Sequence, residues 1–130
     1  MINSRNKGAS FERKVCSELN GWLGCHGRRN VSQAQSGGDD IEFIGESAAD
    51  DFLRRFSFEL KNHSRITDAD FNRHWEQCKR QACDVGKEPV MIYKELRQSI
   101  KVAKWSAEFE CLVRMEFDDF LTWVREQVSV

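Results

Sequence analysis

The sequence predicts an α/β domain in which helices flank a mixed central β-sheet. Apolar residues recur with the helical period in three long segments. These segments are 7–22, 68–85 and 118–128. Between them lie short runs rich in branched and aromatic residues, which are typical of strands. These runs are 40–44, 54–62, 89–93, 100–105 and 110–117. The predicted order is α-β-β-α-β-β-(β)-α, and a chain of 130 residues is expected to form one domain, 1–130.

The first predicted helix carries one apolar stripe. Phe11, Val15 and Leu19 recur every four residues, and Trp22 continues the same face. Glu12 follows Phe11 and therefore lies about 100° further round the helix, at the edge of the stripe. Its carboxylate can reach a pocket between this helix and the sheet.

The second predicted helix has a clear start and a clear end. Thr67 and Asp70 have the spacing of a capping box, and Gly86 is a typical stop. By contrast, the acidic segment 46–51 is expected to be an exposed turn between two strands.

The last predicted helix is expected to begin at Asp118 or Asp119, either of which can act as its cap. The four tryptophans fall on apolar stripes and are expected in the core or at a dimer interface. They are Trp22, Trp75, Trp105 and Trp123.

Composition indicates an ordinary globular chain, because 40% of the residues are apolar and 32% are charged. No apolar run approaches the roughly 20 residues that span a bilayer, and the N-terminus lacks the apolar core of a secretory signal. A cytoplasmic protein is therefore expected, and its five irregularly spaced cysteines are expected to be reduced thiols.

The most informative residues are Glu59 and Lys61. They alternate with Phe58 and Leu60, so the carboxylate and the ammonium share one face of a strand, roughly 6–7 Å apart. Upstream, the acidic segment 36–44 begins as a Gly-rich turn and continues as another apolar strand. Carboxylates from two strands can hold a hard divalent cation, and a neighbouring lysine can position a water.

Charge is distributed in blocks although the net charge is only −1. Residues 36–60 hold seven acidic and two basic residues, whereas residues 1–35 hold six basic and two acidic ones. Residues 61–104 are basic again, with ten basic and six acidic residues. This pattern is compatible with an acidic metal pocket beside a phosphate-binding rim, and equally with solvated helix surfaces.

These motifs, in this order, resemble the archaeal-type Holliday junction resolvases of the PD-(D/E)-x-K nuclease superfamily. The resemblance covers about residues 5–105 and leaves 106–130 as an unmatched C-terminal extension. Its motifs are Lys-Gly-x-x-Phe-Glu-Arg at 7–13, Arg-Arg at 28–29, Ser-Gly-Gly-x-Asp-Ile at 36–41 and Glu-Leu-Lys at 59–61. It implies a restriction-endonuclease-like fold with an α-β-β-α-β core.

The resemblance also implies roles for individual residues. Asp40 and Glu59 would bind Mg²⁺ or Mn²⁺, Glu12 would complete the acidic pocket, and Lys61 would hold the attacking water. Asp39 is the alternative ligand to Asp40. The basic residues that would contact DNA phosphates are Lys7, Arg13, Arg28 and Arg29. A glutamine of the second helix, Gln77, would face the site; the alternative is that it lies on a solvated face of that helix.

The implied function is cleavage of branched DNA, such as a four-way junction, by a homodimer. Three alternatives remain open on the sequence: a nuclease of the same superfamily that acts on linear duplex or DNA ends, a non-catalytic DNA-binding module of the same fold, and an interaction protein with surface charges. By analogy, a phage, prophage or archaeal origin suits a compact nuclease.

Overall fold

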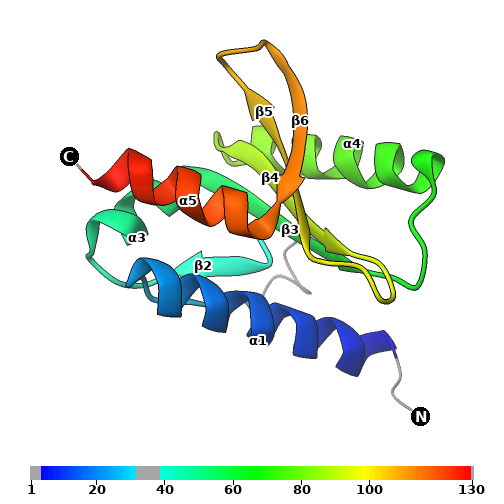
Figure 1. The fold of residues 1–130 in the computed structure, drawn as a ribbon, viewed down its shortest axis with the longest axis horizontal. Coiled ribbons are helices and arrows are strands. Elements are labelled where there is room, and N and C mark those ends of the chain that lie inside the picture. The colour runs from blue at the N-terminus through cyan, green and yellow to red at the C-terminus, as the bar shows by residue number, and fades with distance from the viewer. Residues whose placement is uncertain (1–3, 32–38, 130) are drawn as a thin grey trace.

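The computed structural model describes residues 4–31 and 39–129, so the Gly-rich turn predicted at 36–38 lies outside the described residues. The helices are α1 (Ser4–Leu23), α3 (Ala48–Leu53), α4 (Asp68–Asp84) and α5 (Phe117–Val128). The strands are β1 (Gly27–Arg29), β2 (Ile41–Phe43), β3 (Phe56–Asn62), β4 (Glu88–Lys94), β5 (Lys101–Ser106) and β6 (Cys111–Glu116). Figure 1 shows the sheet in the middle, with α4 on one side and α1 and α5 on the other.

The main sheet has four strands in the order β3-β4-β5-β6. β3 and β4 are parallel, and α4 forms the long crossover that a parallel pair requires. The pairs β4–β5 and β5–β6 are antiparallel. β1 and β2 form a separate antiparallel pair. The predicted mixed sheet flanked by helices is therefore confirmed.

Two hydrophobic cores cover the two faces of the main sheet. On one face Phe56, Phe58 and Leu60 of β3 pack with the buried stripes of α1 and α5. On the other face α4 packs Phe71 and Trp75, with Cys78, against β4 and β5. The strict alternation along β3 therefore leaves Ser57, Glu59 and Lys61 on the α4 side, which is where the polar residues gather.

The predicted ends of α4 are correct. The Thr67 hydroxyl accepts a hydrogen bond from the Asp70 backbone N–H, and the Asp70 carboxylate accepts one from the Thr67 N–H, which is a complete capping box. After the helix, Gly86 adopts a φ of 68°, a left-handed conformation that suits glycine.

The prediction of an exposed acidic turn at 46–51 is wrong, because this segment begins helix α3. Ser47 and Asp50 form a capping box, and the Asp50 side chain is fully buried. The backbone N–H of His26 donates to Asp50 at 2.7 Å, and His26 Nδ1 lies 2.9 Å from its other oxygen. A Cβ at Gly45 would overlap both His26 and Asp50, so a glycine is needed there.

The start of the last helix also differs from the prediction. Helix α5 begins at Phe117 with Glu116 as its N-cap, and no side chain caps it. Asp118 and Asp119 lie in its first turn, where negative charge is favourable to the helix dipole, rather than at the cap.

Two of the four tryptophans are not in the core. Trp75 is buried, and Trp123 packs against Phe52 and Phe56. Trp22 and Trp105 are 57% and 51% exposed, so their place on an apolar stripe does not bury them.

The C-terminal extension is part of the packed structure. β6 adds the outermost strand to the main sheet, and α5 buries Phe117, Phe120, Leu121 and Val124 in the core shared with α1. Within residues 4–31 and 39–129, no helix has the length and apolar character needed to cross a membrane.

Replacing Asp50 with Ala is expected to lower the free energy of unfolding by about 2–4 kcal/mol, because it removes a cap and leaves the partly buried donors of His26 and Ser47 without their acceptor. Burial alone would raise the pKa of Asp50, but hydrogen bonds from His26 and Ser47 outweigh it and hold that pKa well below its ordinary value. This contribution is therefore present at neutral pH and declines as the pH falls toward the depressed pKa. Urea unfolding at several pH values measures it.

The control for this prediction is Asp51→Ala, in the same helix turn. Asp51 is exposed and pairs with Arg54, so its loss is expected to cost less than about 1 kcal/mol. Equal unfolding midpoints for the two variants would contradict the role given to Asp50.

Candidate active site

Asp40 is fixed against the edge of β3 that β4 does not occupy. Its backbone N–H donates to the Phe58 carbonyl at 2.9 Å, and its carboxylate accepts the Leu60 N–H at 2.7 Å. The side chain thus replaces a neighbouring strand at this point, and it is only 5% exposed. Because Glu59 lies between those two β3 residues, the Asp40 carboxylate is held beside it.

Glu59 and Lys61 lie on the α4 side of β3, as the alternation of the strand predicts. Lys61 Nζ is 3.1 Å from Glu59 Oε1, and Glu59 is 6% exposed. The lysine amine is therefore held directly beside a buried carboxylate rather than extended into water.

Negative charge is unfavourable where Asp40 and Glu59 are buried together. Burial, followed by the charge of Glu59, raises the pKa of Asp40. Burial also raises the pKa of Glu59, although Lys61 acts in the opposite direction. The charge of Glu12 adds to the rise in both, which shows that α1 contributes to the same electrostatic site.

Glu12 reaches this site from α1 and is paired with a basic residue. Its carboxylate accepts a hydrogen bond from Arg29 Nε at 3.0 Å, and both side chains are partly buried. Of the three arginines predicted to contact phosphate, Arg29 thus offsets the acidic pocket. Arg28 is exposed and pairs with Glu42, its register partner on β2, at 2.6 Å.

Asp39 occupies a different environment from Asp40. Its carboxylate accepts hydrogen bonds from Ser57 and from Lys87 Nζ, the latter at 3.0 Å. The sequence offers a signal for Ser57, which shares the face of Glu59 two residues on. Lys87 has no local signal, because it follows α4 and reaches Asp39 through the tertiary fold.

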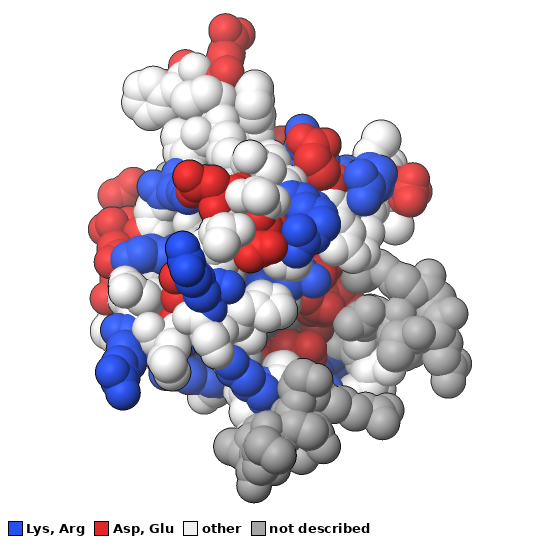
Figure 2. Space-filling model, turned by 90° about the vertical axis from the view of Figure 1, so that its right-hand side faces the viewer, with Lys and Arg blue, Asp and Glu red and all other residues white. Residues whose placement is uncertain are grey.

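The remaining predicted residues lie further out. Arg13 is exposed on α1, and Lys7 is partly exposed near the start of the same helix. Gln77 is partly exposed on α4. On the side that Figure 2 shows, Lys and Arg residues are scattered among acidic and uncharged residues.

A pair of histidines borders Lys61 and was not predicted as a pair from the sequence. The rings of His63 and His74 are stacked, with centroids 5.3 Å apart and planes within 2°. Burial, followed by the charge of Lys61, lowers the pKa of both imidazoles, which favours their neutral forms at pH 7. His63 follows β3 and His74 lies on α4, so the two elements meet beside the lysine.

The oxygen ligands available here suit a hard cation. Across residues 4–31 and 39–129, no group of three or more acidic, histidine or cysteine side chains is arranged as a metal cage. A site with two carboxylates nevertheless fits Mg²⁺, which keeps several waters and takes one or two carboxylates from a protein. The raised pKa values of Asp40 and Glu59 point the same way, because a cation between them would relieve their repulsion.

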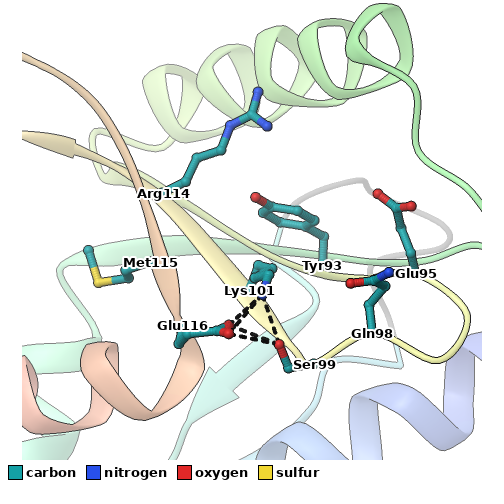
Figure 3. A pocket seen from close by; sticks show the side chains of 8 residues that line it. All are labelled: Tyr93, Glu95, Gln98, Ser99, Lys101, Arg114, Met115 and Glu116. Atoms are coloured by element: carbon teal, nitrogen blue, oxygen red, sulfur yellow. Dashed lines mark hydrogen bonds and ion pairs between the residues drawn. The ribbon is translucent and has the colours of Figure 1, made fainter.

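A separate hollow of about 470 Å³ lies over β4, β5 and β6 and shares none of these residues. Figure 3 shows that Lys101, Ser99 and Glu116 in this hollow are bonded to one another. Lys101 Nζ is 2.7 Å from Glu116, which also accepts a hydrogen bond from Ser99. The Arg114 guanidinium lies 3.5 Å from the centre of the Phe71 ring. The candidate active site is therefore at β3, where the side chains of Asp40 and Glu59 form a carboxylate pair beside Lys61.

Comparisons with known proteins bear on the family to which the chain belongs. A family model described as "Phage putative PDDEXK endonuclease" matches residues 3–126. No curated protein matches the chain. Among solved structures, the Holliday junction resolvase Hjc of the archaeal hyperthermophile Archaeoglobus fulgidus is similar, with a TM-score of 0.47 and 15% identity. The alignment covers 92% of this chain and 98% of that one.

The family match confirms the superfamily that the sequence motifs predict, and it extends across nearly the whole chain, including the part that follows residue 105. The chain belongs to the family of phage PDDEXK endonucleases.

Proposed function

We propose that this protein is a metal-dependent endonuclease that hydrolyses DNA phosphodiester bonds. The observation that carries the proposal is the arrangement of Asp40, Glu59 and Lys61. The two carboxylates are buried and near enough for the charge of one to act on the other, and an amine lies 3.1 Å from Glu59. Buried like charges are costly, so their retention is best explained by a cation that they bind.

Asp40 and Glu59 would hold Mg²⁺ or Mn²⁺, with Glu12 completing the acidic pocket. The cation, when bound, supplies Lewis-acid activation of the phosphate and lowers the pKa of a water. Asp40 is favoured over Asp39 as the ligand, because Asp39 is already paired with Lys87 and Ser57.

Lys61 would orient the attacking water and offset the negative charge that develops on the phosphate in the transition state. Its pairing with Glu59 fixes the amine before DNA arrives. Arg29 limits the excess negative charge through Glu12. Lys7, Arg13 and Arg28 would contact the DNA backbone, which positions the duplex without reading its sequence.

For the substrate, we propose branched DNA, with a four-way junction as the first candidate. Its support is the order of the motifs from Lys7 to Lys61, which resembles that of the archaeal-type resolvases. A single cleavage assay distinguishes branched DNA from the alternative substrates, which are linear duplex and DNA ends.

Asp40→Asn and Lys61→Ala are each expected to abolish Mg²⁺-dependent cleavage, at least a hundredfold, while DNA binding stays measurable. The assay incubates each protein with labelled four-way junction, flap, single strand and linear duplex, with Mg²⁺ or with EDTA. Paired symmetric nicks in the junction are the expected product of the unsubstituted protein.

The matched control is Asp119→Asn, an exposed acidic residue in α5, which is expected to cut normally. Cutting by Lys61→Ala at the normal rate would contradict the role of the lysine. If the only products come from the ends of linear duplex, the proposed substrate is DNA ends and not the four-way junction.

Metal binding has a readout that does not depend on activity. In EDTA, Asp40→Asn is expected to raise the melting temperature, because the amide keeps the Leu60 hydrogen bond and removes a buried charge. Since the pKa of Asp40 is raised by folding, this advantage grows as the pH rises above the ordinary carboxyl pKa.

Added Mg²⁺ is expected to reverse that order, because the cation stabilises the protein that has both carboxylates. Differential scanning calorimetry with Mg²⁺ and with EDTA measures both effects. A melting temperature of the unsubstituted protein that does not respond to Mg²⁺ would count against the metal site.

A homodimer is also proposed, because a four-way junction has two-fold symmetry and a symmetric dimer presents two sites to opposite strands. Sedimentation velocity at micromolar concentration is expected to show a dimer, at least in the presence of junction DNA. A monomer under both conditions would refute this proposal and leave the chemistry of the site untouched.

A further inference from the structure

A second hollow, of about 360 Å³, lies between the first half of α1 and the ends of β3 and β4. It is on the sheet face opposite to the Glu59 side chain, next to the strand end that carries Lys61. The residues that line it are Lys7, Ser10, Phe11, Lys14, Asn62 and Lys94. This combination of amines, a hydroxyl and an amide consists of groups that can donate hydrogen bonds to an anion.

The local structure explains why these side chains converge. Lys7, Ser10 and Lys14 recur at three- and four-residue intervals, so they share one face of α1. Asn62 and Lys94 are register partners in the parallel pair β3–β4, so both point to the same face at the carboxyl ends of their strands. In open α/β sheets, that end of the strands is where ligands commonly bind.

The charged residues that line this hollow are all basic. Its lining has three lysines and no acidic residue. Within the described residues, neither Lys7 nor Lys14 takes part in an ion pair, and the Lys94 amine donates to the Glu95 carbonyl at 3.1 Å. Three lysine amines around one hollow are therefore available to an anionic ligand.

The basic lining of this hollow does not continue into the hollow next to it. The adjoining hollow shares Lys14 and Lys94 but is also lined by Glu18, Glu116 and Asp118. A DNA strand that continued in that direction would meet three carboxylates. The surface therefore fits a single phosphate or two, rather than an extended track.

The position of the hollow relates it to the candidate active site. Lys7 is five residues from Glu12 on α1, about 7.5 Å along the helix axis. On β3, Asn62 directly follows Lys61. The hollow thus adjoins two elements, α1 and β3, that supply residues of the candidate active site.

We propose that the hollow lined by Lys7, Lys14 and Lys94 binds a backbone phosphate of the DNA strand that the carboxylate pair cleaves, a few nucleotides from the cleaved bond. This inference rests on the proposed nuclease function and adds a subsite to it. Lys14, Ser10, Asn62 and Lys94 gain a role that the motifs do not give them. The subsite fixes the position of the strand and reads no base.

The first test is the salt dependence of DNA binding, measured in EDTA so that no cleavage occurs. Lys14→Gln and Lys94→Gln keep the side-chain stem and remove the charge. Each is expected to weaken binding roughly tenfold and to reduce the slope of log affinity against log salt by roughly 0.9 or less. Lys79→Gln, an exposed lysine on α4 paired with Glu76, is the control and is expected to change neither.

The decisive test replaces single phosphates of the substrate with neutral methylphosphonates, one position at a time, on both sides of the cleavage point. One position is expected to weaken binding of the unsubstituted protein, and the same replacement is expected to have no further effect on Lys14→Gln or Lys94→Gln. If the lysine variants keep the full effect at every position, or if no position has an effect, the subsite is overturned.

These outcomes are separable from those of the proposed function. Cleavage by the unsubstituted protein with no position-specific phosphate effect would overturn the subsite and leave the nuclease in place. A phosphate effect that depends on Lys14 and Lys94, in a protein that never cuts DNA, would keep the subsite and overturn the nuclease.

Discussion

The two hydrogen bonds that hold Asp40 against the outer edge of β3 are the constraint on which the candidate site depends. They bury its carboxylate beside Glu59 and so create a concentration of negative charge that the fold must offset. Lys61 offsets it from the same strand, and Arg29 does so through Glu12 on α1. The edge of β3, helix α1 and strand β1 thus each contribute to the balance of charge around Asp40 and Glu59.

Strong local patterns in the sequence were enough to predict much of the fold. The alternation from Phe56 to Lys61 identified both the strand and the face that carries Glu59 and Lys61, and the Thr67 capping box located the start of α4. Helix α3 was missed although Ser47 and Asp50 have the same capping pattern, because a six-residue acidic helix has too little apolar periodicity to stand out. Its Asp50 also bonds to His26, which is distant in sequence, and its Leu53 is buried in the core.

The candidate site was predictable only where its residues are neighbours in the sequence or share a motif. The pairs Arg29–Glu12 and Lys87–Asp39 join elements whose proximity follows from the complete fold. The same holds for His63 and His74, which meet because α4 packs beside the end of β3. The exposure of Trp22 and Trp105 has a related cause, since a stripe shows which face is apolar and not how far a neighbour covers it.

The parallel pairing of β3 with β4 has a consequence for the order of events during synthesis. A parallel pair needs its crossover, so β3 cannot pair with β4 until α4 and residues 88–94 have left the ribosome. Lys87 reaches Asp39 from the end of that crossover. Non-local contacts of this kind form slowly. A nascent chain that already contains both Asp40 and Glu59 therefore still lacks β4, the strand that pairs with β3.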